Sequence, residues 1–367
     1  MSAADMLEPD RVEGTPHPRE TVSLFGQDAA EKTFLDAAAS GRMHHAWLLT
    51  GPRGVGKATL GWRMARHLGS GGRGDTLDMA PDHPVFRQTA QLASPSIFLC
   101  RRPWDAKAER YRTAITVDEV RALKSFFQMS SASEDWRVAI VDATDDLTPS
   151  AANALLKILE EPPARSALIL ICHRPALLLP TLRSRCRELR CQRLGAEQVA
   201  RALQDAGMDV SPADAATLAA LADGSVGRAF ELHVNDGATL FGRIIDLLTG
   251  APGLDRAKAT LFADEAAGRD GGVRFRLTLD LAELALSRLA RKAADPPSAA
   301  PALAGEEALH SRLARTPAQA RIWAEAAPRL RSRAEAARLV NLDPAQIILD
   351  TFLQIDIAAS DAARNAP

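Results

Sequence analysis

Two apolar runs, separated by an amphipathic helix, form the clearest pattern in the chain. They cover residues 138–141 and 167–172, and each has the length of a buried strand. Between them, Thr148-Pro149 is typical of a helix N-cap and first helical residue, and leucines follow on one helical face. Pro162-Pro163 ends that helix, because proline has no N–H to donate. The pattern predicts strand, helix and strand in a parallel α/β sheet.

Another apolar strand, predicted over residues 44–50, leads into the sequence Gly51-Pro52-Arg53-Gly54-Val55-Gly56-Lys57. This is the G-x-x-x-x-G-K pattern of a P-loop, in which glycines allow backbone N–H groups to surround phosphate. Lys57 is expected to reach the β- and γ-phosphate oxygens, and the helix that it opens, to about Leu68, directs its positive end toward the anion. Asp142, which ends the strand at 138–141, is expected at the same edge of the sheet.

Two departures from an ATP-hydrolysing P-loop are visible. Ala58 occupies the position of the hydroxyl that holds Mg²⁺, and Thr59 comes one residue late, about 100° further around the helix. Ala143 follows Asp142 where a glutamate would orient the attacking water. Asp145 and Asp146 are weak candidates to replace that glutamate, because both fall beyond the strand end.

Composition excludes several classes of protein. The chain has 367 residues with 46% apolar and 25% charged side chains, typical of a globular protein of two or three domains. The net charge of −1 gives no support for bulk electrostatic steering onto nucleic acid. Residues 1–20 are polar and predicted to be loose, and they lack the apolar core of a signal peptide, so we expect a cytoplasmic protein.

Metal binding is not expected. The four cysteines, Cys100, Cys172, Cys186 and Cys191, form no C-x-x-C pair, and His67 and His83 are too isolated to complete a tetrahedral zinc site. The adjacent His44-His45 pair has no carboxylate or cysteine at ligand spacing. We therefore predict no zinc site and no other metal ion held by protein side chains.

Beyond residue 192 the pattern becomes helical and alanine-rich. Residues 193–236 are predicted to form a small helical domain, in which Gly224-Ser225-Val226-Gly227-Arg228 is a turn that starts a helix. Residues 237–360 are predicted to form a larger all-helical domain, followed by a tail at 361–367. The α/β domain would then span residues 21–192.

The P-loop, the Asp142 strand, the helix N-A-L-L-K-I-L-E-E-P-P and the Ser184-Arg185-Cys186 tip together resemble the AAA+ subunits of bacterial replicative clamp loaders. The resemblance covers nearly the whole chain, and the helix and the tip carry most of its specificity. It implies a P-loop domain, a small helical lid and a helical collar domain that packs into a ring. It also implies that Arg185 is an arginine finger that reaches ATP on a neighbouring subunit. On residue type alone, a helix cap or a surface ion pair is the more common function of such an arginine.

Within that family the altered P-loop resembles the delta-prime members rather than the ATP-hydrolysing gamma/tau members. The resemblance implies gamma/tau and delta subunits as partners, and contact with the sliding clamp and primed DNA through the DNA polymerase III assembly. Bound ATP or ADP with Mg²⁺ would contact residues that share the P-loop edge and the lid: Gly51, Gly54, Gly56, Lys57, Thr59, Asp142 and Arg228. Own hydrolysis is not expected, and the sequence contains no polymerase carboxylate pattern.

Three other functions remain open at this point. A gamma/tau-type ATPase would need a hydroxyl at Ala58 and a glutamate at Ala143. A branch-migration or remodelling motor usually carries a basic DNA-binding module at its C-terminal end. A small-molecule P-loop kinase would need an acceptor pocket and arginines of its own in a lid.

Overall fold

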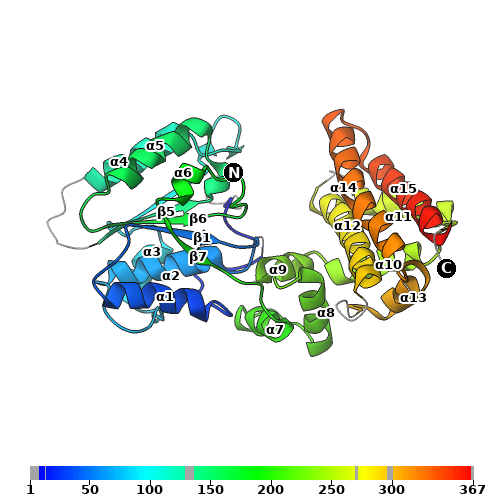
Figure 1. The fold of residues 1–367 in the computed structure, drawn as a ribbon, viewed down its shortest axis with the longest axis horizontal. Helices are drawn as coiled ribbons and strands as arrows, with labels where there is room; N and C mark the ends of the chain where they lie inside the picture. The colour runs from blue at the N-terminus through cyan, green and yellow to red at the C-terminus, as the bar shows by residue number, and fades with distance from the viewer. Residues whose placement is uncertain (1–7, 13, 129–135, 269–271, 296–300, 365–367) are drawn as a thin grey trace. The chain divides into compact units, whose positions relative to one another are not determined.

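The computed structural model of the chain describes residues 8–12, 14–128, 136–268, 272–295 and 301–364 (Figure 1). The chain divides into two compact units. Unit 1 comprises Met1–Ala215 and Ala222–Phe230, and unit 2 comprises Ala216–Leu221 and Glu231–Pro367. The division falls inside helices α8 (Pro212–Ala222) and α9 (Val226–Val234). The three-domain division expected from the sequence, with boundaries after residues 192 and 236, remains a prediction.

Unit 1 is built on a five-stranded parallel sheet of order β2-β5-β6-β1-β7. The strands are β1 (Ala46–Thr50), β2 (Ile97–Arg101), β5 (Arg137–Asp142), β6 (Ser166–Ile171) and β7 (Arg187–Arg190). The strands β1 and β6 are fully buried along their length, as expected for a sheet covered on both faces. The segment at 104–112, which the sequence suggests is a loop, forms the short antiparallel pair β3 (Trp104–Asp105) and β4 (Arg110–Tyr111).

Helices cover both faces of the sheet, with α1 and α2 on one face and α4 and α5 on the other (Figure 1). The helices of this unit are α1 (Asp28–Ala39), α2 (Lys57–Gly69), α3 (Pro84–Ala90), α4 (Val117–Gln128), α5 (Pro149–Glu160), α6 (Pro180–Arg183) and α7 (Ala196–Asp205). The predicted caps are confirmed for α5, where the Thr148 hydroxyl accepts from Ala151 N–H and Pro149 is the first helical residue. Together with the helices of unit 2, this confirms the predicted fold class.

The sheet has two edges that matter for function. At the carboxyl edge, where the parallel strands end, β1 leads into the P-loop and β5 ends at Asp142. At the amino edge, where the strands begin, the chain enters β7 directly after the tip Ser184-Arg185-Cys186. In the register of β1 and β7, Trp47 lies beside Arg187 and Thr50 beside Arg190, so the two edges are separated by the length of a strand.

Unit 2 is helical. It contains α10 (Gly237–Leu248), α11 (Arg256–Ala267), α12 (Val273–Ala294), α13 (Ala304–Leu313), α14 (Pro317–Leu339) and α15 (Pro344–Arg364). The helices α12 and α13 are joined by a buried ion pair in which the Arg288 guanidinium donates to both carboxylate oxygens of Glu306, at 2.6 and 3.0 Å. The last helix extends to Arg364, into the tail expected from residue 361. No helix in the described ranges is long and apolar enough to cross a membrane.

Candidate nucleotide site and arginine tip

The P-loop has the predicted backbone shape, but its lysine is turned onto the loop itself. Gly51, Gly54 and Gly56 all have positive φ values, at 136°, 76° and 98°, which glycine adopts without strain. The Lys57 ammonium donates to the carbonyl oxygens of Gly51 and Pro52 at 2.7 and 2.5 Å. The ammonium N–H groups that would donate to a phosphate are therefore already bound to these two carbonyls. Burial of Lys57 lowers the pKa of its ammonium to about 8, although the nearby carboxylates oppose this change.

The start of α9 rests directly on this loop within unit 1. Ser225 Oγ donates to the carbonyl of Arg53 at 2.9 Å, and Gly227 N–H donates to the carbonyl of Gly54 at the same distance. A Cβ atom on Gly54 would lie 2.3 Å from Ser225 Oγ, so the contact requires glycine. Arg228 is the next residue along α9, and its backbone N–H donates to Ser225 Oγ. The structure thus brings the predicted Arg228 segment onto the P-loop.

Asp142 faces the same group of charges as Lys57. The pKa of its carboxyl is raised to about 7, mainly by burial and then by the negative charge of Asp10, while Lys57 and Arg53 oppose the change. Asp142 and Lys57 therefore lie within electrostatic range of each other. Thr59 lies in the first turn of α2, partly exposed, and its position relative to Ala58 follows from the regular helix.

The two carboxylates beyond Asp142 are already engaged. Asp145 accepts the backbone N–H groups of His173 and Arg174 at 2.6 and 2.8 Å, which fastens the end of β6 to the short 3-10 turn η2 (Thr144–Asp146). Asp146 forms an ion pair with Arg102 at 3.3 Å. Ala143, which occupies the position of the missing glutamate, is 4% exposed. Neither aspartate is arranged to orient an attacking water.

His173 follows the end of β6 at the same edge. Burial lowers the pKa of its imidazole to about 4, and the charge of Lys57 adds to this effect. The imidazole is therefore neutral at physiological pH. It lies within electrostatic range of Lys57, Arg53 and Asp145, so this edge brings cations, carboxylates and a neutral imidazole together.

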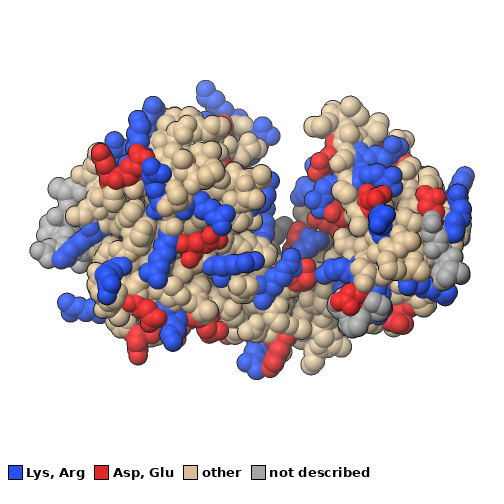
Figure 2. Space-filling view, viewed as in Figure 1, with Lys and Arg blue, Asp and Glu red and all other residues tan. Residues whose placement is uncertain are grey.

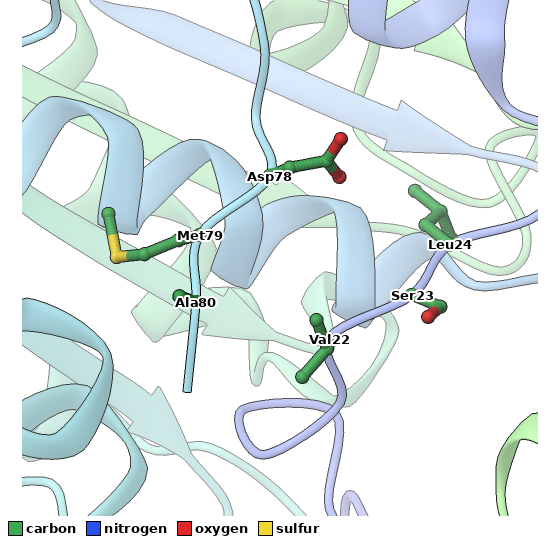
Figure 3. A pocket seen from close by; sticks show the side chains of 6 residues that line it. All are labelled: Val22, Ser23, Leu24, Asp78, Met79 and Ala80. Atoms are coloured by element: carbon green, nitrogen blue, oxygen red, sulfur yellow. The ribbon is translucent and has the colours of Figure 1, made fainter. Parts of the chain in front are cut away.

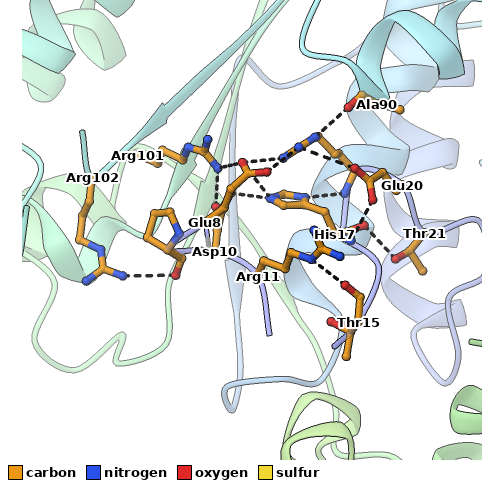
Figure 4. A network of polar contacts seen from close by, with 12 residues as sticks. Glu8, Asp10, Arg11, Thr15, His17, Glu20, Thr21, Ala90, Arg101 and Arg102 are labelled. Carbon is orange, nitrogen blue, oxygen red and sulfur yellow. Dashed lines mark hydrogen bonds and ion pairs between the residues drawn. The ribbon is translucent and has the colours of Figure 1, made fainter. Parts of the chain in front are cut away.

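The N-terminal segment differs from the loose structure expected for residues 1–20. Glu8 pairs with Arg19 at 2.6 Å and also with Arg101, the last residue of β2 (Figure 4). Thr15, His17 and Arg19 are buried. Burial alone would raise the pKa of Glu8, but hydrogen bonds from Arg19 and Arg101 lower it to about 2. Residues 1–7 and 13 lie outside the described residues.

Within the described ranges, Glu8, Asp10 and His17 are the group whose atoms lie close enough together to hold a metal ion. The hydrogen bonds of His17 oppose this function. Its Nδ1 accepts the backbone N–H of Arg19 at 3.1 Å, so the neutral ring carries its proton on Nε2, the atom that lies 3.1 Å from Asp10 Oδ2. Both carboxylates also pair with Arg101 (Figure 4). The group is an ion-pair cluster that fastens the N-terminal segment to β2.

A pocket of about 380 Å³ opens between the segments 22–24 and 78–80 (Figure 3). Val22, Leu24, Met79 and Ala80 give it an apolar lining, and Asp78 and Ser23 add polar groups. None of the predicted nucleotide-binding residues lines it. Its nearest link to the P-loop is Leu24, whose Cδ1 lies 2.6 Å from the position that a Cβ on Gly56 would occupy.

The arginine tip, which we define as Ser184-Arg185-Cys186, is held by the end of α5 and by α6. One terminal nitrogen of Arg185 lies 2.9 Å from Glu160 Oε1, and the other donates to the carbonyl of Thr181 at 3.0 Å. The Arg185 side chain is 36% exposed. The surface ion pair that residue type alone allowed for Arg185 is therefore present in the isolated chain.

Arg185 and the P-loop lie at opposite edges of the sheet. The strand β1, which separates the two levels, has five residues and therefore spans about 16 Å. Arg185 precedes β7 by two residues, whereas Lys57 follows β1 by seven. Its printed partners, Glu160 and Thr181, belong to the amino edge. Arg185 consequently does not serve the nucleotide site of its own chain.

Several residues at these sites were not identified from the sequence. Arg53 acts on Asp142 and His173, Asp145 fastens the end of β6, and Glu160 holds Arg185. The signal for Glu160 was present in the helix ending Glu-Glu-Pro-Pro, but its partner is 25 residues away in sequence. Charged side chains of both signs are interspersed over the visible face of each unit (Figure 2), consistent with the net charge of −1.

Comparison with known proteins shows that about half of this chain is similar to subunits of DNA polymerase III. Residues 26–195 match the family described as "DNA polymerase III, delta subunit". DNA polymerase III subunit delta' of Pseudomonas aeruginosa is 35% identical over 194 residues, which are 52% of this chain and 56% of that protein. DNA polymerase III subunit tau of Escherichia coli is 27% identical over 195 residues, which are 51% of this chain and 28% of that protein. The aligned region thus spans about half or less of these relatives.

Among solved structures, the RuvB Holliday junction branch migration motor of Thermotoga maritima aligns over 75% of this chain and 80% of its own, with 16% identity and a TM-score of 0.40. The fold assignment depends instead on the sheet order and on the P-loop between β1 and α2. The resemblance expected from the motifs is confirmed for the α/β domain. Over residues 26–195, the chain is similar to the DNA polymerase III delta-subunit family and to delta' subunits.

Proposed function

We propose that this chain is a delta-prime-type subunit of a bacterial clamp loader, which donates Arg185 to an ATP site on a neighbouring gamma/tau subunit. The observation that carries the proposal is the position of Arg185 at the amino edge of the sheet, remote from the P-loop of its own chain. An arginine in this position can act on phosphate only if another subunit brings that phosphate to it. A planar guanidinium that remains charged is well suited to stabilise a transferring phosphoryl group.

The chain's own P-loop is proposed to be a poor or inactive site. Lys57 is bound to loop carbonyls, Ala58 and Ala143 lack the groups that hold Mg²⁺ and orient water, and Asp145 is engaged with backbone N–H groups. Bound ATP or ADP with Mg²⁺ would be held by the P-loop glycines, Lys57 and Asp142, with Arg228 approaching from α9. A nucleotide bound there would not be hydrolysed and would have only a structural role in the subunit.

The proposed partners are the gamma/tau ATPase subunits and the delta subunit, with the sliding clamp and primed DNA contacted through the assembly. In this arrangement the chain has the function of a stator, and the helices of unit 2 form its collar domain. The proposed location is the cytoplasm, where replication of bacterial DNA takes place.

The test is ATP hydrolysis by a loader reconstituted with gamma/tau, delta, clamp and primed DNA. Three variants of this chain would be compared with the unmodified chain: Arg185→Ala, Lys57→Ala and the control Arg183→Ala, which removes a neighbouring arginine paired with Glu188. We expect Arg185→Ala to lower turnover at the site it serves by roughly 10³-fold or more. Lys57→Ala and Arg183→Ala should leave turnover within about twofold of that of the unmodified chain. Arg183→Ala removes only a weak surface ion pair, and Lys57→Ala alters a site that is proposed not to hydrolyse ATP.

A second function is favoured by one observation: Lys57 and Asp142, two groups that an active P-loop ATPase uses, lie within electrostatic range of each other. If Lys57→Ala removes as much turnover as Arg185→Ala, this chain hydrolyses ATP itself and is of the gamma/tau type. If Arg185→Ala has no effect, the arginine-finger function is excluded.

A further inference from the structure

The ion pair between Glu160 and Arg185 joins two segments that meet at the amino edge of the sheet. Glu160 is the last residue of α5, and Arg185 follows α6. The two side chains are 2.9 Å apart at their closest atoms and are 49% and 36% exposed, respectively. Each is therefore accessible to another molecule while remaining paired within the chain.

The location of Glu160 is unfavourable for the helix that carries it. The last turn of a helix presents free carbonyl groups and the negative end of the helix dipole, so a carboxylate there is repelled. Besides Lys157, which lies in the same last turn of α5, the positive charge found beside Glu160 is Arg185 from the following segment. The pair compensates for this unfavourable location, which gives Glu160 a reason to remain close to Arg185.

The contacts of Arg185 fix its direction without using all its donors. A guanidinium has five N–H donors, of which Glu160 and the Thr181 carbonyl each receive one. The backbone below is also fixed, because Arg185 N–H donates to the carbonyl of Leu182, a residue with 0% exposure. The side chain is thus held at its base and on two terminal nitrogens, while an external acceptor still has access to it.

We propose that Glu160 is a positioning residue for the arginine finger: its carboxylate holds the Arg185 guanidinium in the orientation that receives the phosphate of a neighbouring subunit. The inference rests on the proposed function of Arg185 and adds a residue to it. Because an ordered arginine loses less side-chain freedom when phosphate binds, the benefit should appear in turnover once the neighbouring ATP site is filled.

The experiment uses the same reconstituted loader and compares Glu160→Gln with Glu161→Gln. Glu161 is the adjacent carboxylate and provides a matched loss of charge at the end of α5. For Glu160→Gln we expect kcat for ATP to fall by about twofold to fivefold with little change in KM, the range expected for a half-exposed ion pair. Glu161→Gln should leave kcat unchanged, and thermal unfolding of both variants should match that of the unmodified chain.

The decisive comparison repeats both substitutions in the Arg185→Ala background. If Glu160 acts through Arg185, Glu160→Gln should have no further effect there. An equal loss in both backgrounds would show a general structural role and overturn the inference, as would a loss equal to that of Glu161→Gln. A rise in kcat would show that Glu160 restrains the finger rather than positions it.

The same data separate the inference from the proposed function. If Arg185→Ala lowers turnover but Glu160→Gln does not, the arginine finger stands and the positioning function of Glu160 is wrong. If Arg185→Ala has no effect, both are wrong.

Discussion

The carboxyl and amino edges of the sheet in unit 1 hold their cationic side chains in different ways. At the carboxyl edge the P-loop has its glycines and Lys57, yet the lysine donates to loop carbonyls and α9 contacts the loop. At the amino edge Arg185 is half-buried, paired and accessible. A chain can therefore lack groups needed for hydrolysis at its own P-loop and still present an accessible arginine at the opposite edge of the sheet.

This difference shows that a P-loop can keep its backbone conformation because neighbouring segments pack against it, independently of ATP hydrolysis. Gly51, Gly54 and Gly56 have positive φ values, and each has a neighbouring atom where a Cβ would lie, so the loop requires glycine even without phosphate. The presence of the glycine motif is thus weak evidence for ATP hydrolysis. The groups that accompany it, at Ala58 and Ala143, are more informative.

The largest effect is expected from a substitution of Arg185 at the amino edge. Arg185→Lys keeps the charge but removes the planar group that donates to two acceptors at once. We expect turnover at the neighbouring ATP site to fall by at least about 10²-fold, measured as clamp- and DNA-stimulated ATP hydrolysis of the loader. Arg183→Lys, the matched change two residues away, should have little effect. Full activity of Arg185→Lys would mean that charge alone suffices.

The next effect concerns stability at the carboxyl edge. Gly51→Ala places a Cβ 2.4 Å from the carbonyl oxygen of Cys191 at a φ of 136°, so the backbone must shift. We expect a loss of about 2–3 kcal/mol in the free energy of unfolding, measured by denaturant titration. Gly41→Ala is the control, because its φ is also positive, at 67°, but no atom lies within 4 Å. Equal losses for the two variants would show that φ strain alone matters.

The smallest effect concerns nucleotide binding to the P-loop. With a pKa of about 8, the Lys57 amine is mostly protonated at pH 7 and mostly neutral at pH 9. Because phosphate binds the protonated form, affinity should be nearly constant below about pH 7 and fall by about tenfold between pH 7 and pH 9. The measurement is a titration with a fluorescent ATP analogue, and Lys57→Arg should remove the pH dependence. Binding that is independent of both pH and Lys57 would assign the nucleotide to another part of the chain.

Local patterns were sufficient to predict many elements. The apolar runs at 138–141 and 167–172 are strands β5 and β6, and the helix predicted from Lys57 to about Leu68 is α2, which ends at Gly69. Thr148 and the prolines bounding α5 fixed its ends, because capping and proline geometry act within a few residues. The short antiparallel pair β3 and β4 was not predicted, because two-residue strands carry too little periodicity to be recognised.

By itself, the sequence determined the type of fold, the P-loop, the lost hydroxyl and glutamate positions and the arginine tip. Each of these is encoded in a short window of residues. The tertiary structure alone decided which distant residues meet: Glu8 with Arg101, α9 with Gly54, and Glu160 with Arg185. These contacts depend on strand order and register, through which burial over the whole sheet brings together segments that no local pattern connects.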